Sequence, residues 1–148
     1  MAEQWADNEK KKEYLNGYLK AKRREKRIIE QIQQLRLDKM FPCLQNDDMP
    51  HAHNCGDLSD YAVKMDDLME ELKLERLESV ERYTDIRKHV LLIKNDDEQE
   101  VIERRYLSGQ SWEKIAEAME YTTRNIHYIH GRALKNFRLP ESFHCFSQ

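Results

Sequence analysis

The chain is poor in the residues that break helices or cross-link chains. Only 4 of its 148 residues are Gly and 3 are Pro, a balance that favours long helices with narrow apolar seams. The three cysteines, Cys43, Cys55 and Cys145, form no even disulfide framework, which favours a reduced compartment over a secreted one.

Long hydrophobic runs are also lacking. The longest aliphatic run, residues 90–93, is far shorter than the roughly 20 residues that span a bilayer. The opening sequence MAEQWADNE lacks the basic and then apolar order of a signal peptide. We therefore expect a cytoplasmic protein with no membrane partner.

Charged residues are abundant but unevenly placed. They make up 36% of the chain, against 39% hydrophobic residues. The segment from Glu9 to Lys39 has eleven basic and five acidic residues. The segment from Asp57 to Asp97 has seven basic and twelve acidic residues. We favour mutual attraction of two helices as the explanation. The alternative is that the cations of residues 20–27 form a second phosphate-contacting face.

Apolar residues recur at helical spacing in two long segments. The first, about residues 8–40, carries Tyr14, Tyr18, Ala21, Ile28, Ile32 and Leu35. The second carries Tyr61, Met65, Leu68, Leu72, Tyr83, Ile86, Val90 and Ile93, with Glu75 and Ser79 thinning its middle. This spacing predicts two long helices that share a coiled-coil-like seam.

The two long helices are expected to form an antiparallel hairpin through a connection at residues 41–58. A two-helix hairpin with such narrow seams buries little surface and is marginal in water. We therefore interpret residues 8–95 as an oligomerisation hairpin and expect the chain to form a homo-oligomer.

Three short helices are expected to follow. Asp97 and Glu100 have capping-box spacing at the start of the first, which should end near Ser108. Ser111 and Thr122 are placed to cap the second and third. The predicted fold is all-α: a long antiparallel hairpin followed by a three-helix helix-turn-helix unit at residues 96–139, with residues 140–148 as a tail.

The last expected helix carries positive charge only. Residues 123–138 contain no Asp or Glu but include Arg124, Arg132, Lys135 and Arg138. A basic helix held at a large angle to its partner fits the major groove of double-stranded DNA. The sequence thus predicts DNA binding.

Residues 98–138 resemble region four of bacterial housekeeping sigma factors. The resemblance is carried by Gly109, Ile115-Ala116, Thr122, Ile126, Ile129 and Ala133-Leu134. Over roughly residues 10–138, the chain is closer to phage and prophage late transcription regulators of the RinA/ArpU type. There the matching pieces are the hairpin, Asp48-Met49-Pro50 with Ser59-Asp60 in its connection, and the ending Ile129-His130-Gly131-Arg132-Ala133-Leu134.

The resemblance implies a set of DNA-binding residues and a partner. It places Thr123, Arg124, His127 and Tyr128 at the groove, beside the capping residue Thr122, and Arg132 and Lys135 at backbone phosphates. Arginine can bind guanine through two acceptors, with a discrimination of about 1–3 kcal/mol, whereas a phosphate contact positions without specifying sequence. The resemblance also implies a bacterial host cell and contact with its RNA polymerase.

Other chemistry is weakly indicated. Cys43, His51, His53 and Cys55 could in principle bind zinc, but His-x-His-x-Cys is not a usual structural zinc pattern, so we predict no metal or other cofactor. No phosphate-binding loop, nucleophile elbow or metal-spaced carboxylate cluster is found, and no catalytic residues or enzyme activity are predicted.

Two functions remain open. The first is a sequence-specific transcription regulator of phage type, which we favour because the expected DNA reader comes last in the chain. The second is a small DNA-packaging subunit of terminase type, in which the reader usually comes first. A weaker third interpretation makes the hairpin a protein-interaction module.

Overall fold

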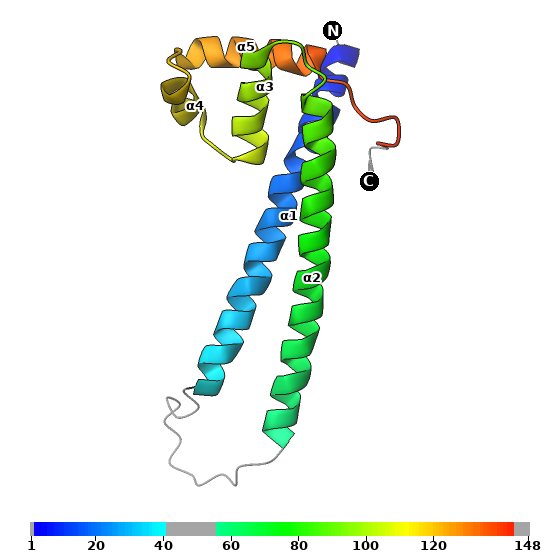
Figure 1. The fold of residues 1–148 in the computed structure, drawn as a ribbon, viewed down its shortest axis with the longest axis vertical. Helices are drawn as coiled ribbons and strands as arrows, with labels where there is room; N and C mark the ends of the chain where they lie inside the picture. Colours follow the sequence, from blue (N-terminus) through cyan, green and yellow to red (C-terminus); the bar gives the residue numbers. More distant parts are fainter. Residues whose placement is uncertain (1, 41–55, 144–148) are drawn as a thin grey trace. The chain divides into compact units, whose positions relative to one another are not determined.

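The computed structural model describes residues 2–40 and 56–143, and the regular structure of these residues is entirely helical, without a strand. The expected all-α class is therefore confirmed. In chain order the elements are α1 (Ala2–Met40), α2 (Gly56–Val90), α3 (Asp96–Ile102), the π-helical turn η1 (Glu103–Leu107), α4 (Trp112–Ala118) and α5 (Thr123–Asn136) (Figure 1).

Two details of the helix boundaries differ from the sequence prediction. The first helix begins at Ala2 rather than near residue 8. The cap of α3 is Asn95, whose side chain accepts a hydrogen bond from the Glu98 amide at 3.1 Å, so the predicted capping box at Asp97 is wrong. Asn is as good an N-cap as Asp, and spacing alone does not distinguish the neighbouring candidates.

The described residues divide into two compact units. One contains residues 2–20 and 79–143, and the other contains residues 21–40 and 56–78. Both unit boundaries fall inside the long helices α1 and α2. No helix in residues 2–40 and 56–143 is both long and apolar enough to cross a membrane.

In the unit of residues 21–78, α1 packs against α2 over a thin core. The buried apolar side chains are Ile28, Ile32 and Leu72, with Met65 and Leu68 packed beside them. So few buried residues stabilise a two-helix unit only weakly.

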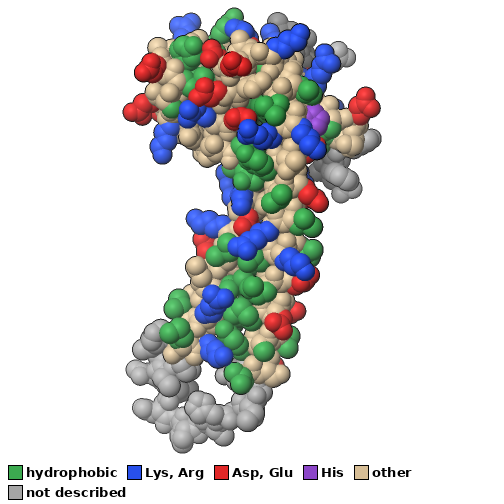
Figure 2. Space-filling model, in the orientation of Figure 1, with side chains coloured by type: hydrophobic (Ala, Val, Ile, Leu, Met, Phe, Trp, Pro, Cys, Tyr) green, Lys and Arg blue, Asp and Glu red, His purple; other side chains and the backbone are tan. Residues whose placement is uncertain are grey.

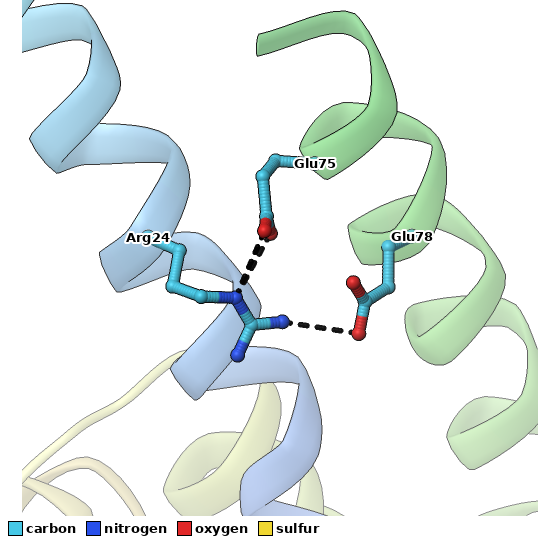
Figure 3. A network of polar contacts seen from close by, with 3 residues as sticks. All are labelled: Arg24, Glu75 and Glu78. Carbon is cyan, nitrogen blue, oxygen red and sulfur yellow. Dashed lines mark hydrogen bonds and ion pairs between the residues drawn. The ribbon is translucent and has the colours of Figure 1, made fainter. Parts of the chain in front are cut away.

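Ion pairs supplement this core. Arg24 donates to Glu75 from Nε at 3.0 Å and to Glu78 from Nη2 at 3.0 Å (Figure 3). Glu25 accepts from Lys22 and Arg76; burial opposes its charge, but these two partners outweigh it and hold the Glu25 pKa below its usual value. The predicted attraction between the two charged helices is confirmed here.

In the other unit, the start of α1 and the end of α2 share one core with the C-terminal helices. Its buried members are Tyr14, Leu15, Ile86, Val90, Ile93, Ile102, Tyr106, Ala133, Leu134 and Phe137. Lys11 donates to the Leu134 carbonyl at 2.9 Å. Phe143, in the segment predicted as a tail, packs its ring 5.2 Å from that of Tyr14. The C-terminal part of α5 therefore packs into a core that includes the start of α1.

Candidate nucleic-acid interface

One side of α5 is buried and fixes its orientation. Ile126 and Ile129 pack with Val101, Ile115 and Ala116 of α3 and α4 in a second core cluster. Ala133 and Leu134, further along α5, enter the first core. Because these four positions recur at helical spacing, the opposite side of α5 is left at the surface.

Capping residues define the start of α4 and α5 as predicted. The Ser111 hydroxyl accepts from the Lys114 amide at 3.4 Å, and the Thr122 hydroxyl accepts from the Asn125 amide at 3.2 Å. Hydrogen bonds from its own amide and from Ser111 hold the pKa of Glu113 below its usual value. Both caps satisfy amide groups that would otherwise lack partners.

The turn between α4 and α5 contains one left-handed residue. Glu120 has a φ of 57°. A non-glycine residue pays roughly 1 kcal/mol for this conformation. The turn is closed by a hydrogen bond from the Tyr121 amide to the Ala116 carbonyl at 2.9 Å. Such a tight closure holds the first turn of α5 beside α4.

The exposed side of α5 brings together most of the residues that the sequence singled out. Thr122, Arg124, His127, Tyr128, Arg132 and Lys135 are at least partly exposed, and Thr123 is half-buried. Neither Arg124 nor Lys135 forms an ion pair or hydrogen bond with another described residue. The helix itself carries no carboxylate. These two cations are therefore available to an anionic partner.

Arg132, unlike Arg124 and Lys135, already has an acidic partner. Its Nη2 lies 2.8 Å from Oε1 of Glu98, whose side chain is only 1% exposed. Asn136 donates to the other carboxylate oxygen of Glu98 at 2.6 Å. The charge of Arg132 is thus already paired inside the protein, which weakens the case for it as a phosphate contact.

An aromatic cluster beneath the exposed side was not foreseen from the sequence. The Trp112 ring lies 4.7 Å from that of His127 and 4.8 Å from that of His130, both of α5. The guanidinium of Arg105 lies over the same indole ring at 4.5 Å. The only sequence signal was the position of Trp112 directly after its capping Ser111. This cluster restricts the rotamers available to His127.

His130 belongs to the interior. It is buried and lies 3.0 Å from the Tyr106 hydroxyl through Nε2. Burial, reinforced by the nearby charges of Lys12, His127 and Arg105, lowers the His130 pKa to about 4. Burial likewise raises the pKa of Tyr106 to about 12. Both groups are therefore uncharged at neutral pH.

Two other candidate sites have less support. Among the described residues, no group of three or more His, Cys, Asp or Glu side chains could hold a metal ion. Cys43, His51, His53 and Cys55, the zinc ligands considered and not favoured from the sequence, lie outside the described residues. In the basic run of α1, Lys22 and Arg24 are occupied by ion pairs with Glu25, Glu75 and Glu78. The exposed side of α5 remains the better candidate for an anionic ligand.

No protein-family model, curated protein or solved structure matches the chain. The assignment of a function therefore depends on the geometry of α5 and its neighbours.

Proposed function

We propose that the chain binds double-stranded DNA through α5, which acts as the recognition helix of a helix-turn-helix unit. The observation that carries the proposal is the exposed side of α5, where Arg124 and Lys135 are free of acidic partners among the described residues. A helix supported on one side and cationic on the other meets the requirements for insertion into a major groove.

The contacts divide by chemistry. Arg124, at the N-terminal end of α5, is placed to read a base edge, because recognition helices contact bases mainly with their first turns. His127 and Tyr128 lie one turn further on and offer hydrogen bonds and an apolar surface. Lys135, near the C-terminal end, serves as a phosphate contact that adds affinity without specificity.

The wider proposal is a phage-type transcription regulator of the RinA/ArpU kind. In this proposal α1 and α2 form the antiparallel hairpin through which copies associate, and the unit containing α5 reads a promoter element beside host RNA polymerase. The support is the residue resemblance in residues 98–138 together with the buried and exposed pattern of α5. Two copies would read two half-sites with a spacing set by the dimer.

Selection from a random duplex pool tests this function. The full chain should enrich one short motif, and binding to that motif should weaken steeply with salt because counterions are released from phosphates. The control is Lys64→Ala, which removes one exposed cation of α2 far along the sequence from α5 and should leave affinity unchanged. Absence of binding to any duplex at low salt would contradict the proposal. Ring-sized particles without sequence preference would favour the packaging subunit instead.

A further inference from the structure

Gly131 occupies an interior position of α5 where the described fold does not need a glycine. Glycine weakens a helix interior relative to alanine, because its backbone loses more conformational freedom on folding. Gly17 and Gly109 have reasons within the fold: a Cβ at Gly17 would lie 2.8 Å from Nη1 of Arg82, and Gly109 has a φ of 67°. Gly131 lacks the positive φ, and a Cβ built there meets nothing within 4 Å. A close approach of another molecule is the remaining use for a glycine at this position.

Gly131 lies on the exposed side of α5. At about 100° per residue, it is roughly 20° around the helix axis from Arg124, 40° from Lys135 and 60° from Tyr128. Both cations are exposed, and the Tyr128 side chain is 64% exposed. The side chains of α5 that are buried in the two cores begin roughly 60° away in the other direction, at Leu134, and extend to the far side of the helix. The missing side chain therefore leaves backbone uncovered on the side that carries the free cations.

The charge around Gly131 favours an anionic ligand. Arg124 and Lys135 have no acidic partner among the described residues, and α5 itself carries no carboxylate. By contrast, the face of the molecule drawn in Figure 2 shows Lys and Arg side chains interspersed with Asp and Glu. Because Gly131 has no side chain, a ligand between these two cations can touch the Cα of the helix instead of the tip of a side chain.

We infer that the sugar–phosphate strand bordering the major groove passes against the backbone of α5 at Gly131. The inference rests on the proposed function, because it takes α5 as a helix inserted into DNA by its N-terminal end. Along the helix axis, Gly131 lies about 10 Å and Lys135 about 16 Å beyond Arg124. The major groove is only about 12 Å wide, so a helix that places Arg124 among base edges meets the bordering strand further along. A strand that lies against Gly131 presents its phosphate to Lys135, one turn later.

The first test measures binding of Gly131 variants to the duplex motif that the parent chain selects. Gly131→Ala should raise the dissociation constant at least about fivefold, because a methyl group added to a close-packed contact forces its surroundings apart. Gly131→Leu is larger and offers no hydrogen bond in compensation, so it should raise the constant at least about fiftyfold. Both variants should be at least as stable as the parent, since Ala and Leu favour helices more than Gly does. Weaker binding by a more stable protein distinguishes a contact with DNA from a role in folding.

Ala62→Leu is the matched control, because it enlarges a small exposed residue of α2 rather than of α5. It should leave the dissociation constant unchanged. If the parent binds the motif and Gly131→Ala binds it as tightly, the inference is overturned and the proposed function stands. If the parent binds no duplex at low salt, both are overturned.

The second test asks whether Gly131 and Lys135 contact the same strand. A leucine at position 131 that displaces this strand should also remove the phosphate from Lys135. Gly131→Leu should therefore reduce the salt slope of binding by about one, as Lys135→Ala does. Adding Lys135→Ala to Gly131→Leu should then weaken binding by less than the product of the two single effects. Independent effects, or a salt slope in Gly131→Leu equal to that of the parent, would overturn the placement of the strand at Gly131.

Discussion

Arg132 of α5 lies 2.8 Å from the buried carboxylate of Glu98, in the first turn of α3. Asn136, one turn later on α5, donates to the other oxygen of the same carboxylate at 2.6 Å. Glu98 therefore holds two successive turns of α5 against α3. A buried carboxylate costs several kcal/mol to desolvate when it lacks such partners.

Replacing Glu98 should lower the stability of the fold. Glu98→Ala removes the acceptor of Asn136 and the partner of Arg132, and we expect the free energy of unfolding to fall by about 2 kcal/mol. Chemical denaturation followed by circular dichroism measures the change. Glu117→Ala, an exposed carboxylate on α4, is the control and should cost less than about 0.5 kcal/mol. A loss at Glu98 no larger than that of the control would show that the carboxylate does not fasten α5.

His130 should make the fold sensitive to mild acid. Its pKa is about 4 in the folded chain, because burial and nearby positive charges disfavour the imidazolium, against roughly 6.5 when unfolded. Above pH 6.5 both states are neutral there, and stability is fully present. As the pH falls from 6.5 to 4, only the unfolded state binds the proton, so stability declines by up to about 3 kcal/mol. His130→Gln should lose this contribution, seen as a shallower slope of unfolding free energy against pH; equal slopes in both proteins would refute it.

Replacing Gly131 by Ala should stabilise α5. It lies inside α5, and a Cβ built there meets nothing within 4 Å. Gly131→Ala should therefore raise the free energy of unfolding by about 0.5–1 kcal/mol, the usual difference between these residues in a helix interior. Thermal denaturation measures the gain. A loss of stability instead would mean that the site does not have the space described.

Two cations of α5 should have different effects on DNA binding. Arg124→Ala should relax base preference at one position, with a cost of about 1–3 kcal/mol on the preferred motif. Lys135→Ala should weaken binding to all sequences equally and reduce the salt slope by about one. Fluorescence anisotropy on matched and scrambled duplexes over a salt series measures both effects. Unchanged affinity and preference in Arg124→Ala would place the recognition surface elsewhere.

Local patterns in the sequence are sufficient to predict much of the helical structure. Ser111 and Thr122 are recognisable as caps because a hydroxyl before a periodic apolar segment has one favourable use. The seam residues Leu72, Ile86 and Val90 are buried as their spacing predicts. Leu15, fully buried, lies beside the predicted stripe and is missed by it, because the core there is wider than a two-helix seam.

Long-range contacts cannot be predicted in the same way. Nothing near Arg132 in the sequence indicates its ion pair with Glu98, which lies thirty-four residues earlier. From the sequence, the positive charge of Arg132 therefore suggests only a phosphate contact. The sequence alone does not indicate whether His130 is exposed or buried; Trp112 and Tyr106, which lie beside its ring, place it in the interior. Such pairings depend on the angle between helices, which apolar periodicity does not specify.

The core that joins Tyr14 and Leu15 to Leu134 and Phe137 also orders events during synthesis on the ribosome. The segments of residues 21–78 can meet as soon as both have emerged from the exit tunnel. By contrast, Tyr14 and Leu15 of α1 meet Ile86 and Val90 of α2 first and are not fully covered until α5 is translated, more than a hundred residues after them. Nascent chains stalled before Leu134 would therefore leave part of this apolar surface exposed, whereas release of the finished α5 would bury it.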